Sequence, residues 1–358
     1  MPESKSAYIA ASYANINQKT SLQQHDFDNK INQLSAISIE PTVLTIDPLA
    51  TPWHSEQKAN HFRSGCAPIM ALEHATHLIR QGEHAVIIQA NDPLKTGYSR
   101  EQRHQLMAVY DDETTIADLY NSLALQFIKN HSLNEEKFTT IATALFENYK
   151  GTYQRLIDSE QAHFSLPSQQ WYGNVTPLFR GVDCANPLID FEGKLLICSG
   201  KVLAQLGCEK SVKIAGVHCC EINTQDETKE LKTLSQYNHL GIAFDEACNA
   251  AQINFSQEFL HHNALLEAYT CYPIVPMAFL LHSGIVKDVS DIAPLLQDYE
   301  ITITGGMNLA RAPWNAPSLN ALIEMNQRLT NSNQHYGAVH GNGGLGYRQG
   351  VAILERVT

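Results

Sequence analysis

Near its end the chain turns twice on clustered glycines, first in Ile301-Thr302-Ile303-Thr304-Gly305-Gly306-Met307 and then in Tyr336-Gly337-Ala338-Val339-His340-Gly341-Asn342-Gly343-Gly344-Leu345-Gly346. Between these turns apolar residues recur at helical spacing, at Leu319, Leu322, Ile323, Met325 and Leu329. This order predicts strand, turn, helix, strand, turn and strand. Glycine-rich turns at strand ends let a ligand approach backbone N–H groups, so a binding site is one interpretation and plain tight turns are the other.

The rest of the chain repeats an alternation of strands and helices. In the first part, strands are predicted over 7–14, 42–46 and 85–88, and helices over 26–37 and 69–81. Further along, strands are predicted over 189–198 and 212–220, and helices over 201–206, 242–252 and 276–282. We therefore expect an α/β protein of two successive halves, residues 1–205 and 206–358.

The segment 91–180 interrupts this alternation. It predicts two helices, over 115–129 and 134–149, and otherwise polar loops. A long excursion between strands of a compact domain usually forms a lid, a binding loop or a subunit contact. The sequence leaves these three interpretations open.

Composition narrows the class of protein. The chain has 358 residues, a hydrophobic fraction of 44% and a formal net charge of −12. An acidic protein without a local basic patch does not attract nucleic acid or an anionic membrane surface. The chain has no apolar run of about 18 residues that could span a membrane, and it starts with the polar segment 1–6. We expect a soluble, cytoplasmic protein.

Neither cysteine nor histidine spacing predicts a metal site. The eight cysteines form no C-x-x-C pair, which argues against a zinc ribbon or a thioredoxin-like redox site and fits a reducing compartment. Among the sixteen histidines, His261 and His262 are adjacent, and neighbouring side chains do not converge on one ion. His74 and His77 lie three residues apart but have no evident third ligand. We expect no metal.

Cys66 is the first candidate for chemistry. It lies just before the predicted helix 69–81, in Arg63-Ser64-Gly65-Cys66-Ala67-Pro68, and Pro68 suits a first helical turn. Unpaired amides and the helix dipole stabilise a thiolate at that position, which makes a cysteine nucleophilic. The alternative is a buried, inert thiol.

Several motifs in this order resemble the thiolase superfamily over most of the chain. They are the turn, helix and strand of 65–88, the strand region 183–199, the segment 267–273, the Gly305-Gly306-Met307 turn and the loop 339–344. The chain is most similar to the sterol-carrier-protein-x-related branch, in particular to bacterial thiolase-like acetyl-CoA acetyltransferases. The resemblance implies a layered αβαβα fold with two pseudo-symmetric halves.

The chain departs from that family at three catalytic positions. Active thiolases carry a Gly-His-Pro whose histidine deprotonates the nucleophile, and here the residues are Arg311-Ala312-Pro313. Tyr269 stands where the family places Asn or His to hold the oxyanion water. Counting back from the glycine that ends the helix, the family nucleophile aligns with Gly65 unless the turn has a deletion, and Cys66 follows it.

By resemblance, the chain is expected to be an acyltransferase that acts on a CoA thioester in lipid metabolism, without a further cofactor. Cys66 would be the nucleophile, and His340, in the second glycine turn, could replace the missing base. A structural role is the alternative for this histidine. Substrate contacts are expected from Tyr269, Gly305, Gly306, Asn342, Gly343 and Gly344.

A second interpretation comes from Ala312, which cannot take up a proton. The chain would then be a non-catalytic protein of the same fold that binds CoA or an acyl group, or serves as the partner of a small protein in an acyl-transfer assembly. A homodimer is expected by analogy. Candidates for phosphate contacts are Lys150, Arg155, Arg311 and Arg348, although for each of them a solvated surface charge is the favoured interpretation.

Overall fold

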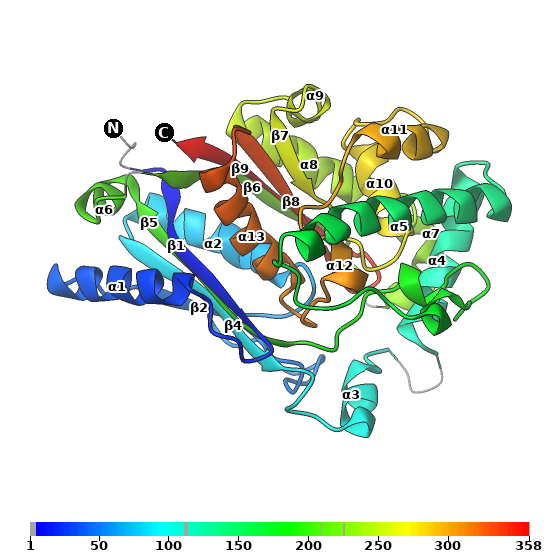
Figure 1. Cartoon of the computed structure of the whole chain (residues 1–358), viewed down its shortest axis with the longest axis horizontal. Helices are drawn as coiled ribbons and strands as arrows, with labels where there is room; N and C mark the ends of the chain where they lie inside the picture. The colour runs from blue at the N-terminus through cyan, green and yellow to red at the C-terminus, as the bar shows by residue number, and fades with distance from the viewer. Residues whose placement is uncertain (1–4, 111–113, 209, 225, 358) are drawn as a thin grey trace.

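The computed structural model describes residues 5–110, 114–208, 210–224 and 226–357, which form one mixed sheet with helices on both faces (Figure 1). The strands of the first half are β1 (Ala7–Ile16), β2 (Thr42–Ile46), β3 (His61–Phe62), β4 (Ala85–Pro93) and β5 (Asp190–Ser199). Those of the second half are β6 (Ser211–Glu221), β7 (Ala264–Glu267), β8 (Tyr336–Gly343) and β9 (Arg348–Val357). Within the described residues the strand order is β3-β2-β4-β5-β1-β6-β9-β8-β7.

The two halves of the sheet mirror each other about its middle. At the outer edges strands pair in parallel, β2 with β3 and β4 in one half and β7 with β8 in the other. Toward the middle β5 pairs antiparallel with β4 and β1, and β9 pairs antiparallel with β8 and β6. The halves join where Tyr8 and Ile9 pair with Lys213 and Val212. The pseudo-symmetric arrangement is therefore as expected, while the division at residue 205, where α6 (Gly200–Gln205) ends, stays a prediction.

Helices lie in three layers around the two half-sheets. α2 (Ala67–Gln81) and α13 (Pro317–Asn331) pack on each other between them (Figure 1). α1 (Gln23–Ala36) and α6 cover the outer face of the first half, and α8 (Asn238–Ala251) and α10 (Ile274–His282) cover that of the second. This is the αβαβα order that the resemblance implied.

The start and end of α2 follow from its sequence. Pro68 occupies the first turn, where the missing N–H of proline costs no helical hydrogen bond. Gly82 ends the helix with φ = 115°, a backbone conformation that favours glycine. The predicted helix over 69–81 is confirmed, and Cys66 lies at its N-cap.

The excursion 91–180 packs mainly on the second half. It contains α3 (Arg100–Met107), α4 (Ile116–Asn130) and α5 (Glu135–Asp158). The buried side chains of α4 and α5 join the hydrophobic core around α8 and α10, whereas α3 has no buried side chain. Thr115 and Asn134 cap α4 and α5 through their side chains. The remaining short helices are α7 (Leu231–Leu234), α9 (Phe255–Leu260), α11 (Ile292–Asp298) and α12 (Gly306–Leu309), and 3-10 turns cover Gln169–Tyr172, Gly181–Asp183, Glu227–Lys229 and Val289–Asp291.

The strand predicted at the start of the first glycine turn is wrong. Residues 301–304 form a buried loop in which the backbone N–H groups of Ile303 and Thr304 donate to the Glu267 carboxylate, at 2.6 and 3.0 Å. The Thr304 hydroxyl donates to the same carboxylate at 2.6 Å. A side chain at the end of β7 thus takes the hydrogen bonds that a neighbouring strand would have taken.

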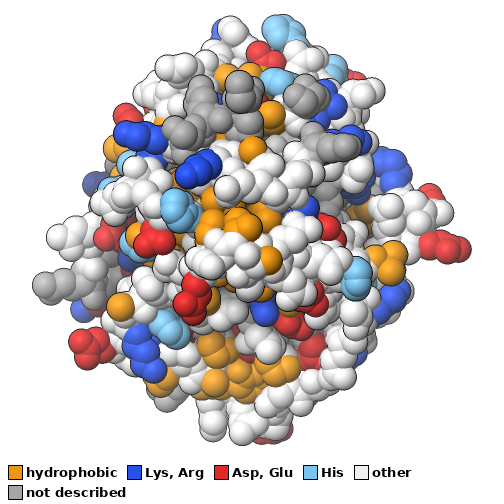
Figure 2. Space-filling view, turned by 90° about the vertical axis from the view of Figure 1, so that its left-hand side faces the viewer, with side chains coloured by type: hydrophobic (Ala, Val, Ile, Leu, Met, Phe, Trp, Pro, Cys, Tyr) orange, Lys and Arg blue, Asp and Glu red, His pale blue; other side chains and the backbone are white. Residues whose placement is uncertain are grey.

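The surface mixes charge signs. The face in Figure 2 carries acidic and basic side chains interspersed with small apolar patches. In the part of the chain that the structure describes, no helix combines the length and the apolar character needed to cross a bilayer.

Candidate functional site

A cavity of about 370 Å³ opens where the turn before α2 meets the ends of β7 and β8. Its wall is largely apolar and aromatic, and includes Trp53, Met107, Ile116 and Trp314. Among the described residues that line it there is no Lys, Arg, Asp or Glu. Residues 104, 107–110, 114–117 and 120 line one side, so the excursion contributes to the cavity wall.

Gly65 is the residue before α2 that lines this cavity. A Cβ atom at Gly65 would overlap the hydroxyl of Tyr269 and the carbonyl oxygen of Asn342. The Tyr269 hydroxyl therefore takes the space that a side chain at position 65 would need. Tyr269 is itself 8% exposed and lines the cavity.

Cys66 does not line the cavity as the structure describes it. Its side chain is fully buried, and its Sγ atom lies against Gly350 of β9 and beside Cys219 of β6. The hydrogen bond between the two thiols, together with burial, holds the pKa of Cys219 well above its usual value. The nucleophile role of Cys66 stays a prediction, and its orientation away from the cavity does not support it.

His340 is buried on the other face of the second half-sheet. Its ring packs 4.8 Å from that of Phe279 in α10, whereas the adjacent Gly341 lies against Cys66 in the middle layer. The Nε2–H donates to Gln349 Oε1 at 2.7 Å, and Nδ1 accepts from the backbone N–H of Tyr269 at 3.4 Å. Burial lowers the pKa of His340 to about 4. The sheet separates this neutral imidazole from Cys66, so its geometry favours the structural alternative.

Asn342 lines the cavity, and hydrogen bonds hold both ends of its side-chain amide. Its Oδ1 accepts from Gln349 Nε2 at 2.7 Å, and its Nδ2 donates to the Tyr120 oxygen at 2.8 Å. The Tyr120 hydroxyl donates in turn to the Gly344 carbonyl at 2.7 Å. Asn342, Gly344 and Tyr120 all line the cavity, so two expected contact residues lie at the same end as Tyr269.

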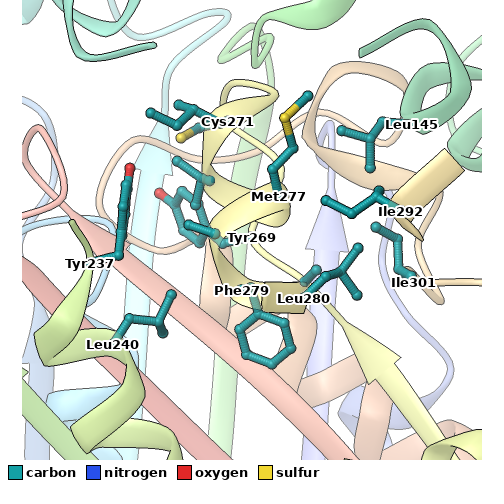
Figure 3. Packing of buried hydrophobic residues seen from close by; sticks show 14 of the residues in the cluster. Leu145, Tyr237, Leu240, Tyr269, Cys271, Met277, Phe279, Leu280, Ile292 and Ile301 are labelled. Atoms are coloured by element: carbon teal, nitrogen blue, oxygen red, sulfur yellow. The ribbon is translucent and has the colours of Figure 1, made fainter. Parts of the chain in front are cut away.

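This end of the cavity is its polar end. Figure 3 shows the hydroxyls of Tyr237 and Tyr269 directed to the same side as Cys271. Cys271 lines the cavity, and burial raises the pKa of its thiol to about 12. Hydroxyl, thiol and amide groups therefore meet here within an otherwise apolar wall, and none of them carries a charge at neutral pH.

The other glycines expected to contact a substrate lie behind the cavity wall. Gly305 and Gly306 have φ values of 87° and 80° and pack against Tyr153 and Thr270. Gly343 lies beside Ser64. Met307, which follows the first turn, does line the cavity. These three glycines shape the turns rather than contact the space inside, and a direct substrate contact stays a prediction.

Ala312 presents its methyl group to the cavity at the position where an active thiolase is expected to carry its histidine. In the same wall Tyr110 donates through its hydroxyl to Glu227 at 3.1 Å. Glu227 also accepts from the backbone N–H of Leu345 at 2.6 Å, and burial raises its pKa to about 7. This pair could not be predicted from the sequence, because Tyr110 and Glu227 lie far apart along the chain.

The four candidate phosphate partners are already engaged. Lys150 pairs with Glu147 at 3.1 Å, Arg155 pairs with Glu300, and Arg348 pairs with Glu221 at 2.6 Å. Arg311 donates to the Leu188 carbonyl at 2.6 Å and lies over the ring of Phe164. A phosphate would have to replace one of these interactions.

Comparison with known proteins identifies the fold. No family model and no curated protein matches the sequence. Among solved structures, a monomeric SCP2-thiolase like protein type 1 from Mycobacterium smegmatis aligns with a TM-score of 0.71 at 16% identity, over 99% of this chain and 78% of that one.

Two further structures align over nearly the whole chain. The Ltp2-ChsH2(DUF35) aldolase gives a TM-score of 0.63 at 14% identity, over 98% of each chain. The Acat5 thiolase from Ascaris suum in complex with coenzyme A gives 0.62 at 10% identity, over 98% of this chain and 100% of that one. The chain therefore has a thiolase-like fold.

Proposed function

We propose that this protein binds an acyl-CoA-type thioester with the acyl group inside the cavity, and that it does not form the acyl-cysteine of a thiolase. The observation that carries the proposal is the place of Gly65. Gly65, which precedes the N-cap of α2 and lines the cavity, has no side chain, and the Tyr269 hydroxyl fills the space. Thiolase chemistry requires a thiolate at the substrate and a base beside it.

The lining supports this ligand class. The volume of about 370 Å³ lies at the small end of the range for small-molecule sites, roughly 300–1,000 Å³. An apolar wall without Lys, Arg, Asp or Glu among its described residues suits an uncharged acyl chain. At the polar end the Tyr269 hydroxyl can donate a hydrogen bond to a thioester carbonyl. The CoA complex of the Ascaris suum thiolase supports the CoA part of the proposal by analogy.

Equilibrium titration with acetyl-, butanoyl- and octanoyl-CoA tests the binding. We expect affinity to rise with chain length, because each buried CH₂ contributes about 0.8 kcal/mol. Ala108→Trp, which fills the cavity, should weaken binding, whereas Ala36→Trp on the exposed surface of α1 should not. Affinity that is independent of chain length and of Ala108→Trp would refute the cavity as the site.

Mass spectrometry separates binding from acyl transfer. After incubation with acetyl-CoA or acetoacetyl-CoA we expect no covalent acyl group on Cys66, and equal turnover in wild type and Cys66→Ala. An acyl group on Cys66, together with turnover that Cys66→Ala removes, would establish the acyltransferase expected from the sequence.

The partner is a separate part of the proposal. The aldolase that aligns with this chain is a complex with a DUF35 protein, and the mycobacterial protein is monomeric. We propose that this chain also acts beside a small partner protein, with the homodimer as the competing state. Sedimentation of the chain purified from its own host distinguishes the two, since a homodimer without a stoichiometric partner contradicts the hetero-complex.

A further inference from the structure

Two thiols flank Gly350, where β9 faces the N-terminal end of α2. Gly350 of β9 pairs with Cys219 of β6. A Cβ atom at Gly350 would lie 2.8 Å from the Cys66 Sγ and 2.9 Å from the Cys219 Sγ. The absent side chain leaves the space into which both sulfur atoms project, one from the N-cap of α2 and one from a strand.

The two cysteines differ in access to solvent. Cys66 is fully buried, whereas Cys219 is only partly buried. Of the two residues, Cys219 is the one with exposed surface, so an oxidant would have to approach the pair through it. Cys220, the next residue, packs with the core on the opposite face of β6, so it provides a matched control.

We propose that Cys66 and Cys219 form a reversible disulfide when a peroxide oxidises Cys219. Cys219 must first lose its proton, and its raised pKa makes this step slow at neutral pH and faster as the pH rises. The thiolate then attacks the peroxide O–O bond, which gives a sulfenic acid and, from hydrogen peroxide, hydroxide. The Cys66 sulfur then attacks the Cys219 sulfur, the S–S bond forms, and water leaves with the proton of Cys66. Two thiols and one hydrogen peroxide thus become one disulfide and two waters.

This bridge would add a covalent link between two elements that already interact through Glu73 of α2, which accepts from the backbone N–H of Cys219 at 3.2 Å and pairs with His218 of β6. It would link the first turn of α2 to β6, and the residue before Cys66 is Gly65, which lines the cavity. Oxidation would therefore fix one part of the cavity wall to the sheet. A cross-link between residues far apart in sequence also restricts the unfolded chain, so the oxidised protein should unfold at a higher temperature.

The test uses the folded full chain treated with hydrogen peroxide, then with N-ethylmaleimide, and digested without reduction. We expect a peptide pair joined through Cys66 and Cys219 that dithiothreitol separates, and a rise of several degrees in the unfolding temperature. Cys220→Ser should keep both effects and Cys219→Ser should lose both. In Cys66→Ala the Cys219 sulfenic acid has no partner, and dimedone should label it.

Several outcomes would overturn the proposal. They are a disulfide of Cys219 with Cys220 or with a second copy of the chain, oxidation of Cys219 to sulfinic acid while Cys66 stays reduced, and loss of the linked peptides in Cys220→Ser. None of these readouts depends on the ligand of the cavity. A failure here is therefore distinct from a failure of acyl-CoA binding.

Discussion

Replacing His340 by Gln should change how the stability of this protein depends on pH. In the folded chain burial lowers the pKa of His340 to about 4, whereas an unfolded histidine titrates near 6.5. Between these values the unfolded state takes up a proton at this imidazole and the folded state does not. The wild type therefore loses stability as the pH falls through that window, and the loss levels off below about pH 4.

The magnitude follows from the two pKa values. One pKa unit corresponds to 1.36 kcal/mol, so the imidazole should account for about 2 kcal/mol of lost stability between pH 7.5 and pH 5. Gln does not titrate. The free-energy difference between wild type and His340→Gln, measured by urea unfolding, should shrink by about that amount over the same range.

A control separates titration from general destabilisation. Leu240→Ala removes a buried apolar side chain from the same hydrophobic core and leaves the imidazole in place. Its stability difference from wild type should therefore stay constant between pH 7.5 and pH 5. A constant difference for His340→Gln as well would show that His340 is not a buried neutral histidine, and would revive its role as a base.

Three further substitutions test other parts of the structure. Gly350→Ala should lower the free energy of unfolding by about 1–3 kcal/mol, because the added methyl group would overlap the Cys66 and Cys219 sulfur atoms. The loss should be smaller in a Cys66→Ala background. Equal losses in the two backgrounds, measured by urea unfolding, would contradict this packing. Glu267→Gln should destabilise the protein by about 1.5–3 kcal/mol, because an amide accepts fewer of the three hydrogen bonds that hold residues 303 and 304. An unchanged midpoint of chemical denaturation would show that the carboxylate does not hold this loop. Tyr269→Phe should weaken binding of an acyl-CoA about 3- to 10-fold but leave an S-alkyl-CoA, which has no carbonyl, unaffected in calorimetric titration; an equal effect on both ligands would show that the hydroxyl does not bind the carbonyl.

Most of the fold could be predicted from the sequence because its signals are local. The helix after Cys66 is set by Pro68, by apolar residues at helical spacing and by Gly82. The loop at 301–304 could not be predicted in the same way. Its apolar and β-branched residues have the pattern of a strand, and the carboxylate that takes its N–H groups comes from Glu267, on a different element.

The sequence pattern predicts which loops lie at the candidate site, but it does not predict which way their side chains point. Tyr269, Asn342 and Gly344 line the cavity, and their contact with a substrate stays a prediction. Which way a residue faces depends on a shift of one position. Gly65 lines the cavity and Cys66 does not, and Gly341 faces Cys66 while His340 lies on the other face of the sheet. The excursion residues in the wall depend on long-range packing, for which the sequence pattern gives no signal.

The contribution of the excursion to the cavity wall has a consequence for how the ligand range could change. The wall residues 104, 107–110, 114–117 and 120 all come from the excursion, while the opposite wall comes from turns fixed to the sheet. A surface segment tolerates insertions and exchanges better than the core that supports it. Exchanging this one stretch between proteins of the same fold should therefore transplant acyl-chain preference and leave the strand pairing of both halves unchanged.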